Sequence, residues 1–290
     1  MKVIKHKFVP VYKAATNGDL NLVNDFVRNA KRLFVVTGAG ISTESGIPDY
    51  RSEGVGLYSS TNHKPMQHQD FIKSSEKRKM YWARNYASWP MFSSFKPNKT
   101  HLTLANWEKK GKIWHHVTQN VDGLMKKSGS LRLTELHGTS YKVKCLNCDF
   151  KLTRDSMQKL IDSNNQNWSE QSNEIAPDND VRLTNEQVKT FNLPVCPQCK
   201  TDMLKPDIVF FGDNIAKPIV NNVNRLLSES DGLLAIGTTL QVYSSYRILL
   251  KAKELGIPIS IINIGPTRGD HMASFNISTK CSDIIQQIEF

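Results

Sequence analysis

Residues 31–43 read Lys31-Arg-Leu-Phe-Val-Val-Thr-Gly-Ala-Gly-Ile-Ser-Thr43. The four consecutive apolar residues 33–36 predict a short buried strand of a parallel sheet. Gly38 and Gly40 follow, and they permit a tight turn with a close backbone approach to a phosphate. Ile41 then opens a predicted helix, whose free N–H groups favour an anion. Taken alone, the stretch favours a dinucleotide site over an ordinary tight turn only slightly, because Thr43 replaces the third glycine of the G-x-G-x-x-G pattern.

The chain has 290 residues, of which 39% are hydrophobic, enough for one large or two modest soluble domains. It contains no apolar run long enough to span a bilayer, so no membrane partner is expected. Thirty-eight basic residues against 27 acidic ones give a net charge of +11, which fits a nucleic-acid partner or an anionic cofactor or substrate. The basic residues are scattered, so direct nucleic-acid binding is not expected.

Four of the five cysteines form two C-x-x-C pairs, Cys145 with Cys148 and Cys196 with Cys199. Without a secretory signal, this spacing predicts a structural zinc site rather than disulfides. Four thiolates leave no open coordination position, so a catalytic zinc is not expected. The 47 residues between the pairs are polar and cannot build a core, so the metal would anchor them.

Strand and helix patterns alternate outside the zinc module. We expect strands at 113–117, 131–136, 207–212, 232–237 and 258–263, and helices at 19–30 (with Asp19 as N-cap), 71–89, 97–111, 220–227 and 244–255. The predicted fold is α/β, a doubly wound parallel Rossmann-like sheet into which a smaller zinc-binding and helical domain is inserted. The predicted boundaries are 1–50, 112–140 and 205–290 for the Rossmann-like domain, 51–111 for a lid loop and helical module, and 141–204 for the zinc module.

Polar residues follow two of the predicted strands, where open α/β sheets bind ligands. Asn120 and Asp122 come after the strand at 113–117, and His137 ends the strand at 131–136. A lone histidine is more often structural, but this position, followed by Gly138, favours a general base.

These motifs together resemble the sirtuin family of NAD-dependent protein deacylases. The matching segments, in family order, are 38–42, 46–51, 118–122, 136–138, the two cysteine pairs and 237–241. The amino-acid sequence at 46–58 and 263–268 is most similar to that of the mitochondrial sirtuin 4 group of class II. The resemblance covers about residue 30 to the end.

The resemblance implies that NAD binds between the Rossmann-like and smaller domains, and that zinc does no chemistry. It implies that NAD is bound by Gly38, Ala39, Gly40, Ser42, Asp49, Tyr50, Arg51, Gln119, Asn120, Asp122, Gly237, Thr238, Thr239, Asn263, Gly265 and Cys281. It assigns catalysis to His137, Asn120 and Asp122, with His137 as general base on a ribose hydroxyl after the acyl oxygen has displaced nicotinamide. An acyl-lysine protein would add as a strand along Val209, Phe210, Phe211 and Gly212, opposite residues 237–242.

The resemblance leaves open which acyl group the protein removes. Tyr50 and Ser244 depart from the family pattern, and the polar stretch between the cysteine pairs resembles an extra loop of the sirtuin 4 group, where activity is often weak. Tyr81 and Arg84 look like the Tyr-x-x-Arg pair that binds acidic acyl groups, and a solvated basic face is the equal alternative for Arg84. Long or acidic acyl groups are therefore expected as substrates.

Two other functions compete with deacylation: ADP-ribosyl transfer to a protein, and a zinc-dependent nucleic-acid-binding module. The first 18 residues carry Lys2, Lys5, Lys7 and Lys13 and no acid, which permits mitochondrial import. With the resemblance, this predicts the mitochondrial matrix. The oligomeric state stays open.

Overall fold

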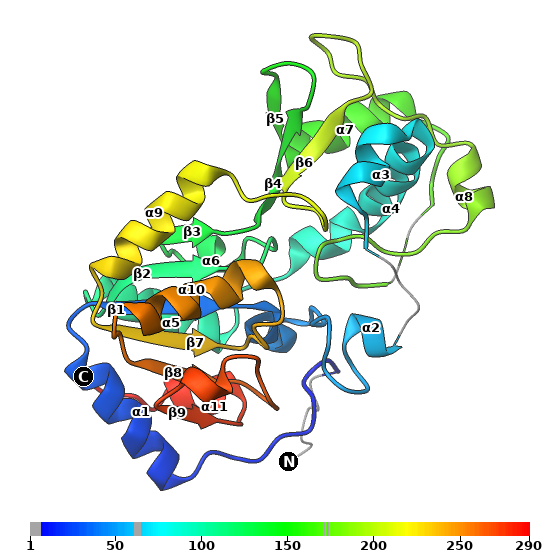
Figure 1. Ribbon diagram of the computed structural model, residues 1–290. Coiled ribbons are helices and arrows are strands. Elements are labelled where there is room, and N and C mark those ends of the chain that lie inside the picture. Colours follow the sequence, from blue (N-terminus) through cyan, green and yellow to red (C-terminus); the bar gives the residue numbers. More distant parts are fainter. Residues whose placement is uncertain (1–6, 61–64, 171, 173) are drawn as a thin grey trace.

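The computed structural model describes residues 7–60, 65–170, 172 and 174–290, and it divides into two parts (Figure 1). Residues 1–6, which carry Lys2 and Lys5 of the basic N-terminus, lie outside the described residues. Among the residues that are described, no helix combines the length and apolar character needed to cross a membrane.

The larger part is built on a six-stranded sheet in which every neighbouring pair is parallel. Its strands, in spatial order, are β3 (Leu133–Glu135), β2 (Ile113–Thr118), β1 (Leu33–Thr37), β7 (Gly232–Ile236), β8 (Ile259–Ile262) and β9 (Phe275–Ile277). All five residues of β1 are buried. The strand order reverses between β1 and β7, so the ligand-binding crevice of a doubly wound sheet is expected at the carboxyl ends of these two strands. The predicted fold class is confirmed.

Helices cover both faces because side chains alternate along β1. Leu33 and Val35 join one core, and Phe34 and Val36 join the opposite core. The first core is closed by α1 (Asn17–Asn29), α5 (Lys99–Lys109) and α11 (Cys281–Ile285), and the second by α9 (Lys217–Ser228) and α10 (Tyr243–Glu254). The remaining short helices are η1 (Ala39–Ser45), α2 (Leu57–Ser60), α6 (Leu124–Lys127) and η2 (Asp270–Met272).

The smaller part lies above the parallel sheet in Figure 1 and contains an antiparallel sheet of β5 (Lys151–Thr153), β4 (Gly138–Cys145) and β6 (Leu204–Ile208). Four helices pack around it: α3 (His68–Lys73), α4 (Ser75–Ser94), α7 (Arg154–Asn164) and α8 (Asn185–Lys189). Trp82 of α4, Met157 of α7 and Phe191 are fully buried in their shared core.

The structure corrects several predicted elements. The strand expected at 207–212 ends at Ile208 and pairs antiparallel with β4, so it does not extend the parallel sheet. The first helix is capped by Thr16, and Asp19 occupies the third helical position of that capping box. Ser74 caps α4 and thereby splits the helix expected at 71–89 into α3 and α4. β9 was not predicted.

Candidate active site

A cavity lies at the carboxyl ends of β1, β2 and β7 and extends to the smaller part of the molecule. It is lined by most of the residues predicted for cofactor, catalysis and substrate: Gly38, Ala39, Gly40, Ser42, Asp49, Tyr50, Arg51, Tyr81, Gln119, Asn120, Asp122, His137, Val209, Phe210, Phe211, Gly237, Thr238, Thr239, Asn263 and Cys281. Three predicted residues, Arg84, Gly212 and Gly265, are not part of its wall.

The glycine turn is pressed against the end of β7. Gly40 N–H donates to the carbonyl of Gly237 at 2.9 Å, and a Cβ on Gly40 would lie 2.8 Å from that oxygen. Gly237 has φ +59° and would bring its own Cβ to 2.7 Å from Ile41 N. The absence of side chains at these glycines therefore allows the turn to pack directly against the end of β7.

The segment after the turn corrects the helix expected from Ile41. It begins at Ala39 and is a 3₁₀ helix, and the N–H groups of Gly40 and Ile41 donate to the carbonyls of Gly237 and Gly38. These two donors are already used within the protein. Thr43, at the position of the missing third glycine, donates from Oγ1 to the Gly40 carbonyl.

The polar residues after β2 form a hydrogen-bonded chain to the glycine turn. Asn120 Nδ2 donates to the Gly38 carbonyl at 3.0 Å and to Ser42 Oγ at 3.1 Å. Ser42 Oγ donates in turn to Asp122 Oδ2 at 2.7 Å. Burial raises the pKa of Asp122, which hydrogen bonds from Leu124 N and Ser42 oppose. Asp122 thus holds the turn through Ser42.

His137 follows β3 and is held at both ring nitrogens. Nδ1 lies 3.0 Å from the Gln119 carbonyl, and Nε2 lies 2.8 Å from Ser244 Oγ. A carbonyl oxygen only accepts, so Nδ1 carries the proton, and Nε2 accepts from the Ser244 hydroxyl. Burial lowers the pKa of His137 to about 4, against the effect of the Gln119 hydrogen bond. The imidazole is therefore neutral at pH 7, the form that a general base needs.

Gly138 allows this arrangement. It has φ +79°, and a Cβ on it would lie 1.9 Å from the Asp207 carbonyl. The backbone of β6 therefore passes directly beside His137, and Val209 N–H donates to the His137 carbonyl at 2.8 Å. Val209, Phe210 and Phe211 are placed beside His137 by this contact.

The segment at 46–56, where the predicted lid loop begins, is a turn around Asp49. The Asp49 carboxylate accepts from the N–H groups of Arg51 (3.0 Å) and Ser52 (2.8 Å) and from the Ser52 hydroxyl. The Asp49 and Tyr50 carbonyls accept from Leu57 and Tyr58. Asp49, Tyr50 and Arg51 are thereby presented to the cavity.

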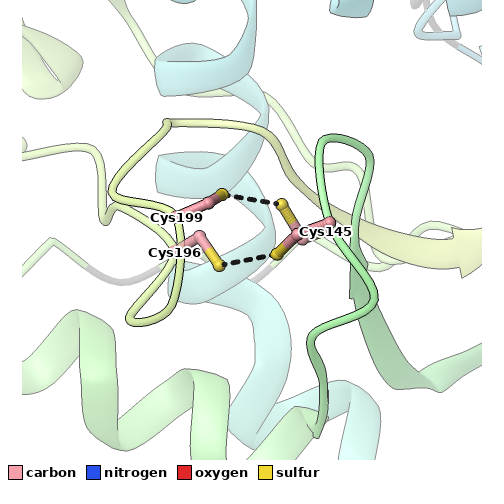
Figure 2. Close-up of side chains that lie close together, drawn as sticks. Cys145, Cys196 and Cys199 are labelled. Carbon is pink, nitrogen blue, oxygen red and sulfur yellow. Dashed lines mark hydrogen bonds between the residues drawn. The ribbon is translucent and has the colours of Figure 1, made fainter.

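The four cysteines of the two C-x-x-C pairs come together at one point. Their sulfur atoms lie within 4.8 Å of one another, with Cys145 to Cys199 at 3.6 Å and Cys148 to Cys196 at 3.7 Å. Figure 2 shows the sulfur atoms of Cys145, Cys196 and Cys199 pointing toward a common centre. Sulfur atoms about 2.3 Å from a tetrahedral zinc are about 3.8 Å apart, so the cluster fits the predicted ion. None of the four cysteines lines the cavity, which fits a structural role.

Tyr81 and Arg84 have different environments. Tyr81 is fully buried, lines the cavity and packs on Phe210 with a ring-centroid distance of 5.2 Å. Arg84 is paired with Asp180 through Nε to Oδ1 at 2.9 Å and Nη2 to Oδ2 at 3.0 Å. The Arg84 side chain is 12% exposed, so the alternative of a solvated basic face is wrong.

Sequence reasoning missed Ser244, Asp178 and Asp180 as site residues. Asp178 and Asp180 line the cavity, and Ser244 contacts His137. The only sequence signal for any of them was the serine at 244 in place of the family's proline.

The fold and site define a member of the Sir2 family. A profile described as the Sir2 family matches residues 38–244, which confirms the predicted family.

The chain is similar in sequence to known proteins over nearly its full length. The chain is 47% identical over 284 residues to the fruit-fly protein "NAD-dependent protein deacylase Sirt4", covering 98% of this chain and 91% of the relative. It is 48% identical over 282 residues to the human protein "NAD-dependent protein lipoamidase sirtuin-4, mitochondrial", covering 97% and 90%. The similarity predicted to the sirtuin 4 group is thereby confirmed.

Solved structures with the same fold contain peptides. One, described as Sir2Tm bound to a propionylated peptide, matches with a TM-score of 0.72 and 26% identity, over 92% of this chain and 96% of that chain. Another, a Sir2 structure with a deacetylated p53 peptide and an acetyl ADP ribose, matches with a TM-score of 0.74 and 26% identity, over the same shares.

Proposed function

We propose that this protein is an NAD-dependent protein-lysine deacylase that transfers the acyl group of an acyl-lysine to ADP-ribose and releases nicotinamide. The class of enzyme follows from the family and from relatives named NAD-dependent protein deacylase or lipoamidase. The observation that carries the proposal is His137, whose imidazole is neutral at pH 7 and which lines the same cavity as the glycine turn and Asn120. Neither ADP-ribosyl transfer nor nucleic-acid binding has an observation in its favour.

The residues around the glycine turn fit NAD. Gly38, Gly40 and Gly237 line the cavity with backbone and no side chain, and Gln119 and Thr238, which also line it, are joined by a 2.8 Å hydrogen bond. When bound, NAD supplies an electrophilic ribose carbon, the nicotinamide leaving group and a ribose hydroxyl. We assign the diphosphate to the glycine turn, and the nicotinamide half to the pocket of Asn120 and Asp122.

The protein's own contribution to the reaction is proton transfer and exclusion of water. His137 Nε2 takes the proton of a hydroxyl, while the Gln119 carbonyl on Nδ1 stabilises the charge that the ring gains. Phe210 and Tyr81 close the cavity with apolar surface and shield the acyl group from water.

The substrate proposed is a protein lysine that carries a long acyl group. The peptide would add as a strand between residues 209–212 and 237–242, which reads backbone more than side chains. The bovine and human relatives are named lipoamidases, and a lipoyl chain is long and uncharged. The cavity extends beyond His137 to Met66, Tyr81 and Pro177, which provides room for such a chain.

We place the protein in the mitochondrial matrix, since the human and bovine relatives are named mitochondrial. A fluorescent protein fused to the C-terminus should colocalise with a matrix marker. A nuclear or cytosolic signal would contradict this placement.

The test of the function uses nicotinamide release from NAD with an acyl-lysine peptide. The wild type should release nicotinamide and free lysine in equal amounts, and His137→Ala should lose about 10²–10⁴-fold in turnover while still binding NAD. The exposed His271→Ala is the matched control and should retain activity. Full activity in His137→Ala would remove the base from the mechanism, and transfer of label from NAD to protein without loss of the acyl group would favour ADP-ribosylation.

A further inference from the structure

We propose that Ser244 controls access to His137: its hydroxyl occupies the nitrogen that takes the proton, and the substrate hydroxyl has to displace it before the base can act. This inference rests on the proposed deacylation and adds a residue to it. The roles assigned to the NAD residues are unchanged.

The hydrogen bonds of His137 leave one ring nitrogen that can accept a proton. Nδ1 lies 3.0 Å from the Gln119 carbonyl, which only accepts, so Nδ1 carries the proton of the neutral ring. Nε2 then has one lone pair, in the plane of the ring, and it accepts from Ser244 Oγ at 2.8 Å. The Ser244 hydroxyl therefore holds the position from which a substrate hydroxyl would give up its proton.

His137 is held in place without the help of Ser244. Gly138 allows the backbone of β6 to pass directly beside the histidine, and Val209 N–H donates to the His137 carbonyl at 2.8 Å. The ring itself is oriented by the Gln119 carbonyl. The imidazole therefore keeps its orientation when the Ser244 hydroxyl leaves Nε2.

Ser244 is held by the helix that carries it. It is the second residue of α10, which begins directly after residues 237–242 of the cavity wall. Ile248 and Leu249 of the same helix are buried in the core on that side of the parallel sheet. The backbone at Ser244 is thus fixed, and rotation about its Cα–Cβ bond is the motion that frees Nε2. Because Ser244 is only partly buried, a rotated hydroxyl can bond to water.

The bond from Ser244 has to be broken in every turnover. A lone pair that already accepts a hydrogen bond cannot take a proton from a second hydroxyl, so the fraction of enzyme with a free Nε2 limits the base step. One neutral hydrogen bond lowers this fraction about fivefold. Ser244 keeps its own proton throughout, since it only exchanges one acceptor for another. The proline of the family pattern has no hydroxyl, so the contact is particular to the serine at 244.

The first measurement needs no substrate. In protein with isotope-labelled histidine, the nuclear magnetic resonance of His137 Nε2 reports whether this nitrogen accepts a hydrogen bond, and His137→Ala identifies the signal. The signal should move in Ser244→Ala and return in Ser244→Thr, which keeps the hydroxyl. Alanine favours a helix, so α10 should be preserved. Ser228→Ala is the matched control, because it removes an exposed serine hydroxyl at the end of α9, outside the cavity wall.

The second measurement is a single turnover with NAD and a lipoyl-lysine peptide. In the proposed reaction nicotinamide leaves before His137 acts, so the delay between nicotinamide release and the appearance of free lysine isolates the base step. Ser244→Ala should shorten this delay about fivefold and leave the rate of nicotinamide release unchanged. Ser244→Thr and Ser228→Ala should keep the wild-type delay.

Two results would overturn the proposal: a His137 signal that does not move in Ser244→Ala, or a delay that is unchanged or longer in that variant. A longer delay would mean that Ser244 supports His137 and does not compete with the substrate. A wild type that releases neither nicotinamide nor free lysine from any acyl-lysine peptide would contradict the deacylation itself. The labelled-histidine measurement would then still decide whether Ser244 occupies Nε2.

Discussion

Lowering the pH should destabilise this protein, because the folded structure contains a buried histidine that resists protonation. His116 on β2 is fully buried beside Thr37, the residue that precedes the glycine turn, with Nε2 2.9 Å from Thr37 Oγ1. Burial, and then the nearby His101 and His115, lower the pKa of His116 from 6.5 to about 3. The perturbation is His116→Gln, which keeps a polar amide and removes the titration.

The sign follows from proton binding in the two states. Below pH 6.5 the unfolded chain protonates His116, while the folded protein does not until about pH 3. The stabilising contribution of the neutral ring is therefore complete above pH 6.5 and is lost as the pH falls toward 3. Between pH 7.5 and 5.5 the linkage relation gives a loss of about 1.3 kcal/mol for this residue. His101, fully buried with a pKa lowered to about 3 by burial, adds a loss of the same order.

The assay is urea unfolding of zinc-loaded protein at the two pH values. On going from pH 7.5 to 5.5, the free energy of unfolding of the wild type should fall by about 1.3 kcal/mol more than that of His116→Gln. This difference does not depend on the absolute stability of the variant. Effects of pH on the cysteines are shared by both proteins and cancel in this difference. The exposed His271→Gln should behave as the wild type. Equal pH dependence in His116→Gln and wild type would refute the reasoning.

Elemental analysis should find one zinc ion per chain, and Cys199→Ser should remove it and unfold the smaller part before the parallel sheet; purified active protein without zinc would contradict the site. Gly138→Ala should cost about 2–3 kcal/mol in urea unfolding, because its Cβ would lie 1.9 Å from the Asp207 carbonyl. Gly129→Ala, at φ +95° with no atom within 4 Å, should cost only the backbone penalty of about 1–2 kcal/mol, and equal costs for the two variants would contradict the packing argument.

The local signals of the sequence were sufficient for five strands of the parallel sheet and for the cysteine cluster. Residues 33–36 form a continuous apolar run that leads into a glycine turn, so the burial of β1 and its turn could be predicted from neighbouring residues alone. The same holds for the cysteine pairs, whose spacing is that of a metal site. In each case the residues that decide the structure lie within a few positions of one another, or repeat a known spacing.

The errors concern partners that are distant in the sequence. Leu204–Ile208 looks like one more strand of the alternating series, and only its pairing with β4 reveals the antiparallel sheet. Phe275–Ile277 is three residues long with an exposed asparagine at its centre, and it forms a strand only because β8 offers an edge. Arg84 has the spacing of a ligand-binding residue, yet its partner Asp180 lies 96 positions away in a polar loop.

The polar stretch between the cysteine pairs is held both by the metal site and by α4. The cysteine cluster holds both ends of the stretch together, and between them Asn179 is bound to Asn85 of α4. Arg154, fully buried at the start of α7, donates to the same Asn85 through Nε and Nη2 at 3.2 and 3.0 Å, so α4, α7 and the loop meet at one side chain. The glycine turn and His137 depend on none of these contacts, because β1, β2 and β7 hold them. Changes in the stretch can therefore move Asp180 at the cavity wall while His137 and the glycine turn stay in place.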